Sequence, residues 1–187
     1  MTIIDTLIEN IFVLDYIAAL LILLLVLVLY FKKKINKNTW ILYWIGFGIG
    51  LLWEIPIGLS REWGVPIAEF VKPRPVLPFP LHSIMHSLWD GGIFILGIYL
   101  VYWLKTSPYF EKFDKIDLAI FIIWGQVQSV IFEIASLIIG LWNYIPNWWN
   151  PSLFDFDGHY FTLLPQLIWL FASIIFYYIT LKFNPSE

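Results

Sequence analysis

Residues 17–30 read IAALLILLLVLVLY, a run whose one polar group is the hydroxyl of its final tyrosine. It is the middle of a longer apolar segment, Ile11–Phe31, which is followed directly by the basic sequence KKKINK. A helix of about 20 apolar residues matches the roughly 30 Å hydrocarbon core of a bilayer, because each residue advances about 1.5 Å. Only 13% of the 187 residues are charged, whereas soluble domains carry about 25%. We therefore predict an integral membrane protein.

Four further apolar segments follow, so we predict one all-α domain over residues 1–187, a polytopic bundle of five transmembrane helices. The predicted spans are Ile11–Phe31, Trp40–Ser60, Leu81–Leu104, Asp117–Trp142 and Phe161–Leu181. One set of flanking segments carries eight lysines, and the other carries Arg61, Lys72 and Arg74. The positive-inside rule then predicts that the N-terminus lies outside and the C-terminus inside. We expect the location to be a prokaryotic cell membrane.

Two connections on the predicted outer side, residues 61–80 and 143–160, are rich in proline and aromatic residues. Both are too apolar for solvated linkers, and Trp and Tyr favour the depth of the lipid headgroups. We expect these connections to lie at the interface or to fold over the outer end of the bundle.

Among the ionisable side chains of the predicted spans we single out five: Glu54, His82, His86, Asp90 and Glu133. An ionisable residue at mid-membrane costs about 2.5 kcal/mol or more, so each one marks a candidate functional position. Counted from the helix ends at about 1.5 Å per residue, all five lie in the outer half of the bilayer. We predict that they line one membrane-embedded site.

The helical phase of these residues agrees with a common site. Glu54 recurs at intervals of four with Gly46, Gly50 and Gly58, and small residues at that spacing let another helix approach closely. Glu133 shares a face of the fourth span with small and polar residues, namely Gln126, Ser129, Ser136 and Gly140. Gln126 and Ser129 can serve the site or only bond neighbouring helices.

A carboxylic acid beside a histidine is a general acid/base pair. In an apolar, tryptophan-rich cavity such a pair can protonate a carbon–carbon double bond, while aromatic faces stabilise the resulting cation. We predict Glu133 or Glu54 as the acid, His86 as the proton shuttle and Asp90 as the group that orients it. The expected substrate contacts are Trp53, Trp89, Gln126, Ser129 and Trp169. No cofactor is expected.

The segment WIGFGIGLLWE, residues 44–54, resembles the W-x-G-F…E helix of the sterol-isomerase-like EXPERA membrane family. HSIMHSLWDG is similar to that family's E-x-x-x-x-x-LWG helix, with His82 where the family has a catalytic glutamate, and WGQVQS is similar to its Gly-Gln pair. Gln166 and Trp169 match an Asn-x-x-Trp spacing, which implies that both contact substrate. Ile49 stands where the family has a histidine, and Glu54 is one residue out of register.

A second resemblance covers residues 125–170 and is to the carotenoid lycopene cyclase and hydratase membrane proteins. SVIFEIASLIIGLWNY resembles their S-x-x-x-E…G-x-W/Y-x-Y segment, and GHYFTLLPQLIW resembles the G-x-Y…P…W that follows. Both resemblances imply an isomerase, cyclase or hydratase that moves a proton on an isoprenoid or sterol-like, lipid-soluble substrate.

Two other classes remain open. His82, His86 and Asp90 recur at intervals of four and could ligate zinc or iron in a membrane hydrolase or oxidase, completed by Glu54, Glu133 or His159. A non-enzymatic lipid-binding protein, transporter or accessory subunit is the other class. We expect membrane lipid as a partner, allow an oligomer, and expect no nucleic acid because the net charge is only −3.

Overall fold

The computed structural model describes residues 6, 8–71 and 74–186, so Lys72 of the charge count lies outside the described residues. Within them, five helices are long and apolar enough to cross a membrane. They are α2 (Ile11–Phe31), α3 (Lys37–Glu62), α4 (Leu81–Leu104), α5 (Lys115–Ile139) and α6 (Leu163–Phe183). The predicted bundle of five transmembrane helices is confirmed.

Two predicted helix ends lie two or three residues from those in the structure, which are Ile139 of α5 and Leu163 of α6. Gly140 has a left-handed backbone with φ 73°, the conformation that commonly terminates a helix, so α5 stops before it. Trp142, predicted to end the fourth span, lies in strand β2 (Trp142–Tyr144) instead. Phe161, predicted to begin the fifth span, lies in strand β4 (His159–Thr162), which directly precedes α6.

Helix α3 is longer than its predicted range, Trp40–Ser60, because Asn36 caps its first turn. The Asn36 side chain accepts a hydrogen bond from the Thr39 backbone N–H at 2.8 Å. The same asparagine donates from Nδ2 to the carbonyl oxygen of Pro185 at 2.6 Å. This turn therefore also holds the C-terminal segment of the chain.

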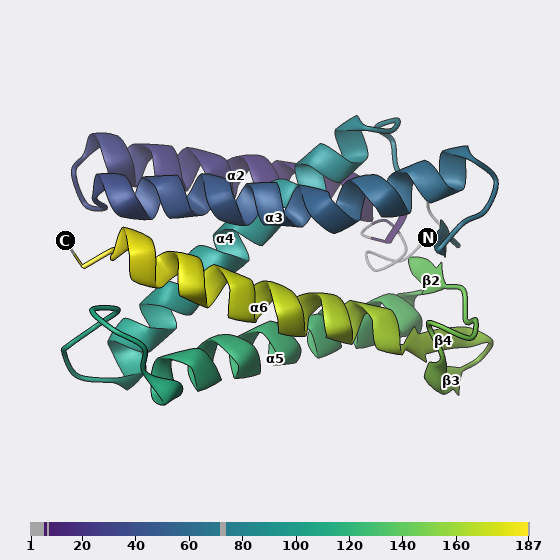
Figure 1. Cartoon of the computed structure of the whole chain (residues 1–187). Helices are drawn as coiled ribbons and strands as arrows, with labels where there is room; N and C mark the ends of the chain where they lie inside the picture. The colour runs from purple at the N-terminus through teal and green to yellow at the C-terminus, as the bar shows by residue number, and fades with distance from the viewer. Residues whose placement is uncertain (1–5, 7, 72–73, 187) are drawn as a thin grey trace.

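Four short strands, which the sequence did not predict, lie at one end of the bundle (Figure 1). Strand β1 (Ala68–Phe70) pairs antiparallel with β2, and β3 (Ser152–Phe156) pairs antiparallel with β4. The strands of both proline- and aromatic-rich connections thus fold over this end of the bundle. This is one of the two arrangements that we predicted, the other being a position at the membrane interface. The C-terminus lies at the opposite end (Figure 1).

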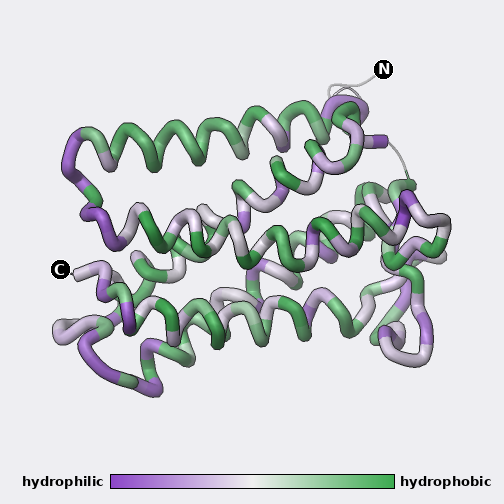
Figure 2. Tube along the Cα trace, turned by 45° about the horizontal axis from the view of Figure 1, so that its top comes forward, coloured by the Kyte–Doolittle hydropathy of each residue, from purple (hydrophilic) through white to green (hydrophobic). Residues whose placement is uncertain are grey.

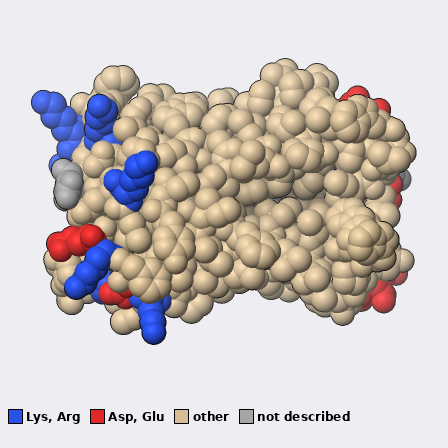
Figure 3. Space-filling view, in the orientation of Figure 1, with Lys and Arg blue, Asp and Glu red and all other residues tan. Residues whose placement is uncertain are grey.

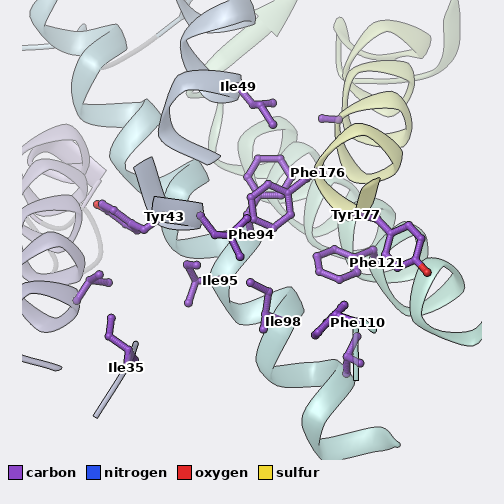
Figure 4. Packing of buried hydrophobic residues seen from close by; sticks show 14 residues of the cluster. Ile35, Tyr43, Ile49, Phe94, Ile95, Ile98, Phe110, Phe121, Phe176 and Tyr177 are labelled. Carbon is purple, nitrogen blue, oxygen red and sulfur yellow. The ribbon is translucent and has the colours of Figure 1, made fainter. Parts of the chain in front are cut away.

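Helices α3 and α4 pack closely through glycine. A Cβ atom added at Gly46 would lie 2.9 Å from the ring of Phe94 and 3.2 Å from the Cα of Gly91. The predicted glycine face of the second span is therefore confirmed as a helix contact. Phe94 also belongs to the aromatic core, where its ring stacks on the ring of Phe176 of α6 with the two centroids 4.4 Å apart (Figure 4).

Replacing Gly46 by alanine is expected to lower the free energy of unfolding by about 1–3 kcal/mol, because the added methyl group overpacks a buried contact. Gly48 on the same helix provides the control, since a Cβ there meets no atom within 4 Å. Gly48→Ala should be neutral or stabilising by about 0.5–1 kcal/mol. Thermal melting of both variants in detergent measures the difference; equal destabilisation would show that the contact is not tight.

The helices consist mainly of hydrophobic residues along their length, and hydrophilic residues gather toward the ends of the bundle (Figure 2). Lysine and arginine side chains cluster at the end that carries the C-terminus, while the middle of the molecule shows none on the visible face (Figure 3). This distribution suits a chain that crosses a bilayer. The direction of insertion, with the N-terminus outside, stays a prediction.

Candidate functional site

A cavity of about 150 Å³ lies at the end of the bundle where the strands are, and all five helices contribute to its lining. Strands β1 and β2 add Ala68, Phe70, Trp142 and Tyr144. Nine of the predicted site residues line the cavity: two histidines, three carboxylates, three tryptophans and one serine. These are Trp53, Glu54, His82, His86, Trp89, Asp90, Ser129, Glu133 and Trp169.

His86 joins three helices through its two ring nitrogens. Its Nε2 lies 3.0 Å from Asp15 Oδ2 on α2, and its Nδ1 lies 3.7 Å from Glu54 Oε2 on α3. A protonated imidazole donates from both nitrogens, so two flanking carboxylates suit that form. Asp15 and Glu54 thus occupy the orienting positions that we had predicted for Asp90.

His82 is packed inside the bundle, not exposed at an interface, and only 4% of it is accessible. Its Nδ1 lies 2.9 Å from the hydroxyl of Tyr16. The rings of Phe12 and Phe70 meet it edge-on, with centroids at 5.5 and 5.0 Å. The ring centroid of His86 is 4.1 Å away. His82 is thus held by Tyr16 and Phe12 of α2, and its ring supports the position of the neighbouring His86 ring.

Asp90 and Glu133 are the two most buried carboxylates that line the cavity, 7% and 8% exposed. Asp90 Oδ2 has no hydrogen-bond partner among the described residues, and the side chain packs against Gly50. Glu133 Oε2 accepts a hydrogen bond from Trp142 Nε1 at 3.4 Å. Among the described residues, neither carboxylate forms an ion pair.

Indole rings form much of the apolar wall. Trp53 of α3 and Trp169 of α6 face each other with centroids 5.3 Å apart. Trp89 Nε1 donates to the backbone carbonyl of Asp15 at 3.2 Å, which fixes the part of α2 that carries this carboxylate. All three tryptophans line the cavity, and their contact with substrate stays a prediction.

Two predicted substrate contacts, Gln126 and Gln166, do not line the cavity. Gln126 Nε2 donates to the Gln166 carbonyl oxygen at 3.0 Å, and Gln166 Nε2 donates to Ser129 Oγ at 3.2 Å. These bonds join α5 to α6, so both glutamines act as interhelical links. Gln166 reaches the site only through Ser129.

Sequence reasoning missed Asp15, Arg61 and Tyr144, which all line the cavity. Asp15 could have been found, because it is the only carboxylate in the segment Ile11–Phe31. The Arg61 guanidinium lies 4.3 Å from the centroid of the Phe70 ring, at cation–π distance.

Tyr144 lies on β2, outside the membrane-spanning helices. Burial raises the pKa of Tyr144 well above its usual range, and the nearby carboxylates of Glu133 and Glu54 raise it further. Its phenol therefore stays protonated and can donate a hydrogen bond into the cavity.

In the part of the chain that the structure describes, no group of three or more His, Asp or Glu side chains is arranged to hold a metal ion. His82 Nδ1 is engaged by Tyr16, and both nitrogens of His86 face carboxylates. The metal alternative thus gains no support from the ligand geometry.

The chain matches no family model, and no curated protein or solved structure shows significant similarity to it. The two family resemblances stay predictions, and the functional assignment depends on the geometry of the cavity.

Proposed function

We propose that this protein is an integral membrane enzyme that performs acid/base chemistry on a lipid-soluble isoprenoid or sterol-like substrate. The observation that supports the proposal most directly is His86, with Asp15 and Glu54 at its two nitrogens, in the same cavity as Asp90 and Glu133. Proton donors and acceptors thus meet in a cavity walled by tryptophan. That combination suits protonation of a carbon–carbon double bond.

In the proposed step, the acid form of Glu133 gives its proton to one carbon of the double bond. The π electrons form the new C–H bond, and a cation develops on the other carbon. The indole faces of Trp53 and Trp169 stabilise that charge. A proton then leaves a neighbouring carbon for the carboxylate of Glu54, which lies beside His86, and the double bond reappears in a new place. His86 acts as the shuttle that takes this proton from Glu54 and returns it toward Glu133, which restores the enzyme.

A hydrophobic core on the side of the cavity toward the basic end favours chemistry over transport. Phe94, Phe121 and Phe176 are almost fully buried there and pack on one another (Figure 4). A transporter needs a polar route across the bundle. These rings occupy the middle of the molecule where that route would run.

The test is deuterium transfer from solvent. The purified protein is analysed for co-purified lipid by mass spectrometry, then incubated in D₂O with linear isoprenoids, carotenoids and sterols. We expect a bound isoprenoid or sterol, and a product that carries deuterium at one carbon. His86→Leu should abolish the transfer, because the shuttle is removed.

His159→Leu is the matched control, since His159 does not line the cavity. Equal transfer by wild type and His86→Leu would contradict the proposal. Zinc or iron near one per chain in elemental analysis would support the metal alternative instead.

A further inference from the structure

A second hollow, of about 730 Å³, lies at the opposite end of the bundle. The turn between α2 and α3 forms one side of it, and the last turns of α4 contribute Tyr99 and Tyr102. Pro185 closes it from the C-terminal segment, which Asn36 holds in place. The hollow is thus built from three segments that are far apart in the sequence.

Three lysines line this hollow: Lys33, Lys34 and Lys37. All three are exposed, and among the described residues no carboxylate lies within 4.0 Å of their ammonium groups. The N-terminus of α3 adds partial positive charge at the same place. The charges therefore favour an anionic ligand, on the end where lysine and arginine gather (Figure 3).

An unsatisfied polar atom also lines the hollow. The hydroxyl of Tyr102 is buried and has no hydrogen-bond partner among the described residues. Burying a hydroxyl without a hydrogen-bond partner destabilises the protein. A ligand oxygen that accepts this hydrogen bond would remove that cost and bind more tightly. Lysine ammonium groups and a phenol are together a donor set for phosphate.

Apolar helix faces lead away from the hollow toward the middle of the membrane. On α2, Leu24, Val28 and Phe31 are all exposed at spacings of four and three, and Phe31 lines the hollow. On α4, Leu96 and Tyr99 are exposed at a spacing of three, and Tyr99 also lines it. Residues at these spacings share one face of a helix. Acyl chains could lie along both faces.

We propose that this hollow binds the headgroup of an acidic phospholipid. The phosphate lies among Lys33, Lys34 and Lys37 and accepts a hydrogen bond from Tyr102, while the acyl chains lie on α2 and α4. Free phosphate shares the headgroup chemistry but does not use the apolar faces. The lipid should therefore bind more tightly than inorganic phosphate.

The experiment uses the full chain in detergent and measures binding of phosphatidylglycerol by native mass spectrometry, with phosphatidylcholine and inorganic phosphate as separate probes. We expect one saturable phosphatidylglycerol site. Lys33→Gln/Lys34→Gln/Lys37→Gln should weaken it by about tenfold or more, because each basic group near a membrane contributes several-fold to the binding of anionic lipid. Tyr102→Phe should weaken it several-fold.

The matched control is Lys112→Gln/Lys115→Gln/Lys182→Gln, which removes the same charge from residues that do not line the hollow. Its affinity should stay within about twofold, since distant exposed charges are screened. Equal loss in both triple variants would overturn the proposal in favour of diffuse attraction. Competition by inorganic phosphate at the same concentration as the lipid would overturn the assignment to a lipid. Melting temperatures of the variants confirm that each is folded.

Discussion

Replacing Lys105 by methionine is expected to lower the free energy of unfolding by about 3–5 kcal/mol. Lys105 Nζ lies 2.6 Å from Asp114 Oδ2 and 2.8 Å from Asp117 Oδ1. Asp117 is 0% exposed, and its other oxygen has no hydrogen-bond partner among the described residues. Methionine keeps the apolar stem but removes the cation, so the Asp117 carboxylate is left buried without its counter-charge.

Loss of secondary and tertiary structure during titration with a denaturing detergent measures the effect of Lys105→Met. The double variant Lys105→Met/Asp117→Leu should recover most of the lost stability, because it removes the unpaired charge as well. Asp114→Asn should cost clearly less, since the Asp114 side chain is 33% exposed and water can solvate what remains. A double variant that is less stable than Lys105→Met would contradict the explanation by an unpaired buried charge.

The second large effect concerns turnover. Glu54→Gln and Glu133→Gln are each expected to reduce deuterium transfer by about 10²–10⁴-fold, the usual contribution of a general acid or base. Glutamine has nearly the same shape and its oxygen can still accept the hydrogen bond from Trp142, so folding should be kept. The rate of deuterium incorporation, measured beside the melting temperature, separates loss of chemistry from loss of structure.

Glu62→Gln is the control, because Glu62 lies on the same helix as Glu54 but does not line the cavity. It should leave turnover within about twofold of wild type, as expected for an exposed charge outside the site. Survival of turnover in both Glu54→Gln and Glu133→Gln would show that these carboxylates are not the acid and base.

Much of this arrangement follows from local sequence. Apolar runs of membrane-spanning length fix the number of helices, and the four-residue recurrence of Gly46 and Gly50 fixes the face on which α4 packs. The cost of placing charge in a membrane singles out Glu54, His86, Asp90 and Glu133. The structure brings these four into one cavity because their helices meet at one end of the bundle.

Other features of the fold and the site depend on contacts between segments that are distant in the sequence. Helical periodicity does not predict such contacts. Asp15 lies 71 positions before His86, and only the packing of α2 on α4 brings the two together. Pairing of Ala68 with Tyr144 likewise joins two separate connections. Gln126 was assigned to substrate from the polar face of its helix and Gln166 from a family resemblance, yet each finds a partner on the facing helix.

The tryptophan wall of the cavity has a practical consequence. Four of the 11 tryptophans line the cavity, namely Trp53, Trp89, Trp142 and Trp169. A molecule that fills the cavity displaces water from these indoles, and their fluorescence should then move to shorter wavelength. A conjugated polyene should in addition quench it. The protein thus carries an optical reporter of occupancy within its own site and needs no attached dye.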